Sequence, residues 1–243
     1  MTRATISIMY RDQLRALLSP VEHAVFKKLS SPARIQDYLE ALPHNFSKKT
    51  GETCRSPRRM LKDKRAYCFE GALFAAASLA YWGRKPLLLD LQTIHDDQDH
   101  VVALFFNERG LWGAISKTNN PVLRWRDPVY RSVRELAMSY FHEYFLYKDG
   151  RKTLRAYSRP FDLSRFAPET WVTSEKSLDW LAEALDDSPH LPLAPKSAMR
   201  KLRRATVLER KILDLEEWKP RRNVEVPTKA SGKNSNSSSL SPF

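Results

Sequence analysis

The most strongly apolar part of the chain is residues 68–82, CFEGALFAAASLAYW, and its composition predicts a helix. Gly71 and several alanines keep this helix thin, and Gly83 directly after it is a good stop signal. Small side chains let neighbouring elements approach a helix closely, so such a helix normally runs through a core. The pattern therefore predicts a buried central helix that begins at Cys68.

Short apolar runs bounded by turn residues follow this helix and predict β-strands. Residues 86–92, 99–106 and 111–116 form three such runs. The turn sequence NERG at 107–110 joins the second run to the third, so these two are expected to pair as an antiparallel hairpin. Residues 121–128 are expected to extend the same sheet.

Further helices and turns are predicted around the sheet. Residues 19–22, SPVE, combine a capping box with proline at the first helical position. Helices are expected at 20–29, 31–42, 131–140, 174–185 and 196–218, and a hairpin at 144–157. Residues 44–66 lose periodicity, and we expect them to form a long loop in front of the central helix.

These elements predict an α+β fold in which the central helix packs on an antiparallel sheet. Residues 1–187 are expected to form one domain with helices at its N-terminus. Residues 188–218 are expected to form a proline-rich linker and a basic amphipathic helix. Residues 219–243 are polar and cannot bury a core, so they are predicted to be a disordered tail.

Positive charge is concentrated in two segments. The formal net charge is +13, and residues 48–65 carry eight basic residues against two acidic ones. Residues 196–222 carry ten basic residues against four acidic ones. A basic field favours nucleic acid, acidic membrane surfaces or acidic proteins as partners.

Each basic segment has two interpretations. Residues 48–65 are either a solvated surface loop, which is the commoner case for a charge run, or a gate that selects acidic substrates. Residues 196–218 either bind nucleic acid or pack one apolar face and leave the charges in water. The chain has no helix-turn-helix pattern or aromatic RNA-binding motif, so specific nucleic-acid recognition has weak support.

Several classes of protein are disfavoured by the sequence. There is no apolar stretch of 18 or more residues, so no transmembrane helix and no membrane partner are predicted. The N-terminal residues lack the apolar run and cleavage site of a secretory signal. Two cysteines, Cys54 and Cys68, cannot build a disulfide scaffold. We therefore expect a cytoplasmic protein with reduced thiols.

Cys68 and His100 are the residues with the clearest catalytic potential. The first turn of a helix has unsatisfied N–H groups that stabilise a thiolate, and these amides could also bind an oxyanion. His100 opens the strand 99–106, from which an imidazole could reach the helix start and form a thiolate–imidazolium pair. Most free cysteines are simply buried, but the helix start, the basic approach and the spaced histidine together favour catalysis.

No metal or cofactor is predicted. The residues His95, Asp96, Asp97, Asp99 and His100 form a dense acidic and imidazole cluster. Their spacing fits no standard zinc pattern, and a solvated loop tolerates such charges. Cys54 lies in the basic loop and is interpreted as a bystander.

The segments CFEGA at 68–72, GRKP at 83–86, DHVV at 99–102 and LWGA at 111–114 together resemble the transglutaminase-like superfamily. Papain-like cysteine proteases are more distant relatives of that superfamily. The resemblance covers about residues 60–120, and the flanking sequence after it is similar to a bacterial branch. It implies a thiol-dependent hydrolysis or acyl transfer of an amide or peptide bond, with Cys68 as nucleophile and His100 as base. The substrate would be a peptide or protein, with acidic substrates one option.

The third residue implied by the resemblance departs from the family pattern. The family places an acidic residue, and the papain group an asparagine, on the return strand to orient the imidazole. The matching position here is Ser116, with Asn119 and the more distant Asp127 as alternatives. The papain group's upstream glutamine is replaced by Lys62. The alternative is thus a catalytically inactive module that uses its basic segments to hold an acidic protein or nucleic acid.

Overall fold

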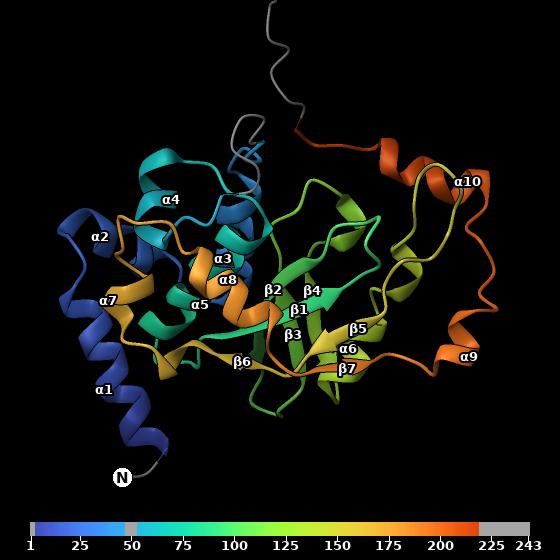
Figure 1. Ribbon diagram of the computed structural model, residues 1–243. Coiled ribbons are helices and arrows are strands. Elements are labelled where there is room, and N and C mark those ends of the chain that lie inside the picture. Colours follow the sequence, from blue (N-terminus) through green and yellow to red (C-terminus); the bar gives the residue numbers. More distant parts are fainter. Residues whose placement is uncertain (1–2, 47–52, 219–243) are drawn as a thin grey trace, which may run out of the picture.

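A seven-stranded, antiparallel sheet forms the centre of the protein (Figure 1). The computed structural model describes residues 3–46 and 53–218. The strand order is β4-β3-β2-β1-β5-β7, and β6 pairs with β1 off this path. The strands are β1 Leu87–Gln92, β2 His100–Phe106, β3 Trp112–Ile115, β4 Arg126–Tyr130, β5 Ala156–Ser158, β6 Phe161–Asp162 and β7 His190–Pro192. The expected α+β class with an antiparallel sheet is confirmed.

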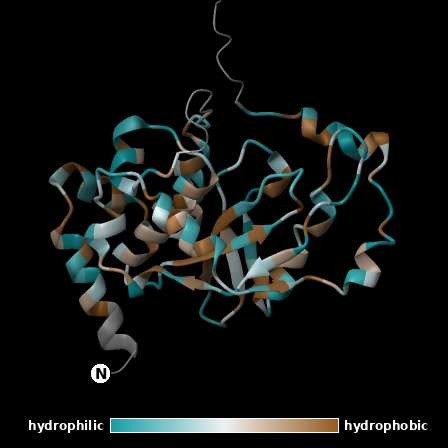
Figure 2. Cartoon of the chain, viewed as in Figure 1, coloured by the Kyte–Doolittle hydropathy of each residue, from teal (hydrophilic) through white to brown (hydrophobic). Residues whose placement is uncertain are grey.

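The central helix α5, Cys68–Tyr81, is buried along its whole length and packs against β2. Side chains alternate across a strand, and β2 shows this clearly. Val101, Ala103 and Phe105 belong to the core shared with α5. Val102 and Leu104 pack on the opposite face of the sheet, in a second core. Figure 2 shows the hydrophobic residues gathered in the sheet and in the helices that cover it.

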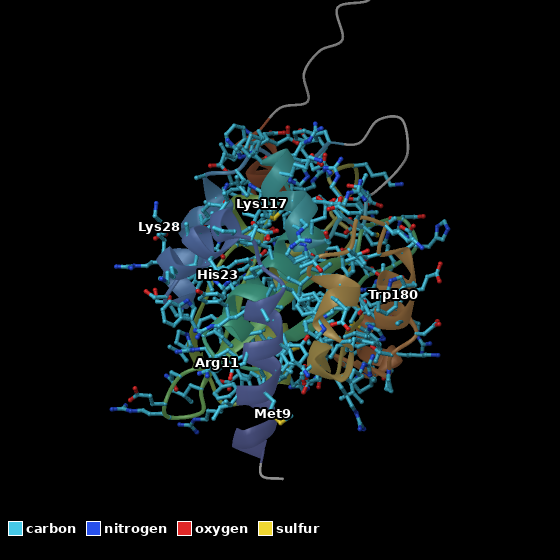
Figure 3. All side chains as sticks on the ribbon, turned by 90° about the vertical axis from the view of Figure 1, so that its left-hand side faces the viewer. Met9, Arg11, His23, Lys28, Lys117 and Trp180 are labelled. Carbon is cyan, nitrogen blue, oxygen red and sulfur yellow. The ribbon has the colours of Figure 1, made fainter. Side chains whose placement is uncertain are left out.

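Short helices cover the two faces of the sheet. The helices besides α5 are α1 Arg3–Ala16, α2 Pro20–Lys28, α3 Pro32–Glu40, α4 Pro57–Asp63, α6 Val133–Met138, α7 Pro168–Trp171, α8 Asp179–Asp186, α9 Lys196–Met199 and α10 Val207–Arg210. Helices α1, α3 and α4 contact α5, while α6 contacts β3 and β4. Seen from the helical side, Arg11 of α1 and His23 of α2 lie away from Trp180 of α8 (Figure 3).

The prediction that residues 44–66 form one long loop is wrong, because Pro57–Asp63 form helix α4. Ser56 accepts a hydrogen bond from the Arg59 amide, Pro57 takes the first helical position, and Met60 is fully buried. These are ordinary helix-start signals that the dense positive charge obscured. Part of the basic segment, residues 47–52, lies outside the described residues, as does the predicted tail 219–243.

The C-terminal part also differs from the expectation. The predicted linker contains β7, which pairs with β5. The predicted helix at 196–218 is instead α9, α10 and the 3-10 helix η4, Lys211–Asp214. Ala205, between the helices, donates its amide to the Gly150 carbonyl at 2.8 Å, so tertiary hydrogen bonding replaces helix continuation. The expected hairpin at 144–157 is reduced to one bridge, Phe145 with Lys152.

Among residues 3–46 and 53–218, none of the helices combines the length and apolarity needed to cross a bilayer.

Gly71 sets how closely α5 approaches the end of β3. A Cβ atom built on Gly71 would lie 2.4 Å from the Lys117 Cβ and 3.2 Å from its Cγ. Lys117 follows β3 by two residues and is 1% exposed, so its stem cannot easily move away. The absence of a side chain at Gly71 therefore allows the start of α5 to lie against the chain just beyond β3.

We predict that Gly71→Ala destabilises the protein. Helix propensity alone would make alanine more favourable than glycine by about 1 kcal/mol. Overpacking of a tight contact typically costs about 1–3 kcal/mol, and here the clash is with a rigid part of Lys117. Urea denaturation followed by circular dichroism measures the sign directly. A more stable Gly71→Ala variant would show that the contact does not constrain α5.

Candidate functional site

A cavity of about 310 Å³ lies where the start of α5 meets the end of the sheet. Cys68 and His100 both line it, together with Lys117, Asn119 and Tyr144 among others. Elements distant in sequence supply these side chains: α5, β2, the chain after β3, and the segment after α6. Three of the residues singled out from the sequence, Cys68, His100 and Asn119, thus share one cavity of the size that binds small groups or side chains.

Cys68 occupies the first position of α5 and is 7% exposed. The same helix start holds Glu70, whose Oε2 accepts a hydrogen bond from the Tyr67 amide at 3.1 Å. Glu70 is fully buried, and this burial raises its pKa, against the hydrogen bond from Thr53 and the charge of Arg55. A protonated Glu70 leaves the positive end of the helix available to Cys68, whereas an ionised one competes with a thiolate for it.

His100 opens β2 and hydrogen-bonds Ser116, with 2.7 Å between Nε2 and Oγ. Along β2 it shares the parity of Val102 and Leu104, whose side chains pack away from α5. His100 is the first residue of β2, and at this end of the strand its side chain lines the same cavity as Cys68. The Ser116 hydroxyl, one of the candidates for the third residue, therefore lies within hydrogen-bond distance of the imidazole.

Gln36 of α3 fixes Ser116. Its Nε2 donates to the Ser116 carbonyl at 2.9 Å, and its Oε1 accepts from the Ser116 amide at 2.9 Å. Gln36, Ser116 and His100 are all at most 5% exposed. A buried residue held by both of its backbone groups has little freedom, so the Ser116 hydroxyl is presented to His100 in a defined place.

The cavity disfavours positive charge on His100. Burial lowers the pKa of His100 to about 4, Arg126 and His44 act in the same direction, and a hydrogen bond with the Leu123 backbone opposes them. The imidazole is therefore neutral at pH 7. A preformed thiolate–imidazolium pair, as the sequence suggested, is not favoured, but a neutral imidazole can accept a proton during a reaction.

The other two candidates for the third residue are engaged elsewhere. Asn119 lines the cavity, but its amide makes two hydrogen bonds to the backbone of Trp218. Asp127 accepts a hydrogen bond from the Trp125 indole at 2.8 Å on the surface. Of the three candidates, the hydrogen bond to His100 is made by Ser116.

Three further residues line the cavity that the sequence did not single out. His44 has a buried Nδ1 without a hydrogen-bond partner among the described residues, and burial, followed by Lys117, lowers its pKa to about 4. Lys117 donates to the Leu42 carbonyl, and burial lowers its pKa to about 8. The buried Tyr144 hydroxyl likewise has no partner among the described residues. Burial raises the pKa of Tyr144, with Cys68 contributing in the same direction.

The arginines of the basic segment are largely used inside the fold. Arg58 forms an ion pair with Glu22 at 2.8 Å and donates to the Leu17 carbonyl at 2.9 Å. Arg55 lies 3.2 Å from Asp63 and 3.9 Å from Glu70. These contacts attach α4 to α2 and α5, which favours a structural role for this part of the segment over a substrate gate.

A second cavity adjoins the first and is acidic. Tyr67, Asp97 and Asp99 line both cavities, and the second adds Asp90 and Asp186. Of these, Asp90 hydrogen-bonds His190, with 3.0 Å between Asp90 Oδ2 and His190 Nε2. Burial raises the pKa of Asp186 to about 6, and Asp90 and Asp99 add to it. Among the described residues, no group of three or more acidic, cysteine or histidine side chains has the arrangement of a metal site.

No protein-family model matches the chain, and no similar protein is found among the curated proteins. The interpretation of the site therefore rests on its own residues.

We predict that His100 titrates with a midpoint near pH 4. Burial sets this midpoint, and Arg126 and His44 lower the pKa further. The measurement is ¹H–¹⁵N NMR of the imidazole, assigned by comparison with His100→Gln. A midpoint near the ordinary value of about 6.5 would contradict this electrostatic picture.

Proposed function

We propose that this protein hydrolyses an amide or peptide bond, or transfers its acyl group, with Cys68 as nucleophile and His100 as general base. Ser116 orients His100 as a positioning residue. The observation that carries the proposal is the hydrogen-bonded series Gln36–Ser116–His100, which ends in the cavity that also contains Cys68. A buried histidine held by a second residue, in one cavity with a cysteine at a helix start, supplies the groups that nucleophilic catalysis uses.

The reaction can be followed by bonds and protons. His100 takes the thiol proton on one ring nitrogen as Cys68 Sγ attacks the carbonyl carbon, while Ser116 Oγ, 2.7 Å from Nε2, holds the ring. The oxyanion is stabilised by amides at the start of α5, with Tyr144 as a further donor from the same cavity. The C–N bond then breaks, and the amine leaves with the proton from His100. Water, deprotonated by His100, then attacks the thioester carbonyl. The C–S bond breaks, the carboxylic acid leaves, and Cys68 Sγ takes the proton back from His100.

The order of elements supports a transglutaminase-like core for this proposal. A cysteine at the first turn of α5, a histidine at the start of β2 and a return strand β3 before Ser116 follow the order of that superfamily. Helix α5 packs on β2, which pairs with β3 in antiparallel register. The departure is the uncharged Ser116, which gives weaker support to an imidazolium than a carboxylate does. Hydrolysis is preferred to amine transfer because no amine site is identified.

We predict that Cys68 reacts faster than Cys54 with iodoacetamide at neutral pH. Exposure alone favours the opposite order, because Cys68 is buried and Cys54 is half-buried. His100→Ala should slow alkylation of Cys68 by roughly tenfold or more, since removal of a base from such a pair costs about 10²–10⁴ in catalysis. Ser116→Ala should slow it less. Peptide mapping by mass spectrometry, with Cys54 as internal reference, gives both rates.

His44→Ala is the matched control, since it removes another imidazole from the same cavity. It should leave the Cys68 rate unchanged. If Cys68 reacts no faster than Cys54 and His100→Ala has no effect, Cys68 is not an activated nucleophile. A loss of reactivity in His44→Ala but not in His100→Ala would assign the base to His44 instead.

A binding module without catalysis is the second candidate, and the uncharged Ser116 favours it. In that case the remaining basic residues would hold an acidic protein or nucleic acid. Binding of a fluorescent oligonucleotide should then weaken steeply between about 50 and 200 mM salt and be unaffected by Cys68→Ala. Absence of binding at the lower salt concentration would exclude the nucleic-acid form of this candidate.

A further inference from the structure

The C-terminal segment forms part of the wall of the Cys68 cavity. Leu213, Leu215 and Glu216 line it together with Cys68 and His100. Figure 1 shows this segment passing from α10 back along the sheet end. Arg204 and Arg210 attach its beginning to the turn at 147–150, through Asp149 and the carbonyls of that turn. The chain is thus anchored before residue 213, and residues 213–218 then pass the cavity. We call residues 213–218 the strap.

Asn119 binds the strap through its backbone. The Asn119 Oδ1 accepts the Trp218 N–H at 2.8 Å, and its Nδ2 donates to the Trp218 carbonyl at 2.8 Å. Both bonds go to main-chain groups of one residue, so this contact does not depend on the side chain at that position.

Charge complementarity gives this contact selectivity. Arg124 pairs with Glu217 of the strap at 2.7 Å. The ammonium of Lys117 lies 6.0 Å from the centre of the Trp218 ring, at the outer limit of a cation–π contact. An acidic and aromatic segment therefore lies against two cations, and one of them, Lys117, lines the cavity.

We propose that residues 213–218 occupy the groove in which substrate binds, and that the groove takes an acidic peptide. The strap holds the place of this peptide and covers Cys68 until it leaves. This inference rests on the proposed function, because it calls the bound peptide a substrate. Whether the strap occupies the groove, and whether it can be displaced from it, can be tested separately from catalysis. The strap's own sequence, DLEEW at 214–218, is the pattern that the groove accepts.

Opening the strap should expose Cys68. In the full-length protein, Asn119→Ala and Glu217→Arg should each raise the iodoacetamide reaction rate of Cys68 by roughly three- to tenfold, the effect of losing one or two hydrogen bonds. Asp214→Arg makes the same charge change in the strap at an exposed residue without an ion pair in the described part of the chain, and should leave the rate nearly unchanged. The charge swap Arg124→Glu with Glu217→Arg should restore protection.

A peptide in trans tests which ligand the groove takes. KILDLEEW, residues 211–218, should slow alkylation of Cys68 in Glu217→Arg, whereas KILDLKKW should not. Unchanged rates in Asn119→Ala and Glu217→Arg, in variants that keep the wild-type thermal unfolding midpoint, would overturn the proposal, and so would equal protection by both peptides. If the strap variants react faster while His100→Ala has no effect, the strap is real and the proposed catalytic pair is wrong.

Discussion

The close contact between α5 and the chain beyond β3 is the constraint on which the site depends. It exists because Gly71 has no side chain where the Lys117 stem passes. Gly71 is three residues after Cys68, and Lys117 is the residue after Ser116. The contact therefore fixes the helix start and the return strand relative to each other. Gln36 adds a second fixed point, since it binds both backbone groups of Ser116 from α3.

Burial determines the electrostatics of this site more than the net charge does. The chain carries +13, but several arginines pair inside the fold, and the cavity lowers the pKa of two histidines to about 4 and of Lys117 to about 8. Because all three shifts oppose positive charge, the site favours a neutral base over a standing ion pair. Charge is also unevenly distributed over the two adjoining cavities. Lys117 lines the first cavity, Asp90 lines the second, and Tyr67 lines both.

Local signals made much of the fold predictable. The helix at 68–82, the three following strands and the capping box at Ser19 all arise from interactions between near neighbours, which the sequence displays directly. Ser116 was predictable by position on the return strand. The roles of Gln36 and His44 were not predictable. Gln36 acts through a contact with a residue 80 positions away in the sequence, and the pKa of His44 is set by its burial. Neither leaves a periodic pattern in the sequence. Strand β7 was missed because proline-rich segments usually end strands, whereas an edge position tolerates them.

One segment that the local pattern misassigned, residues 196–218, ends at the candidate site. Residues 196–218 have helical spacing, yet their path is set by Asn119 and Arg124 at the cavity and by the turn at Gly150. Where the local sequence favours a continuous helix and the structure has none, tertiary contacts and not local preference determine the path of the chain. A continuous helix would carry Leu213 and Glu216 away from Cys68. The broken path places them in the cavity wall, so the cost of interrupting the helix is offset by contacts that only the site provides.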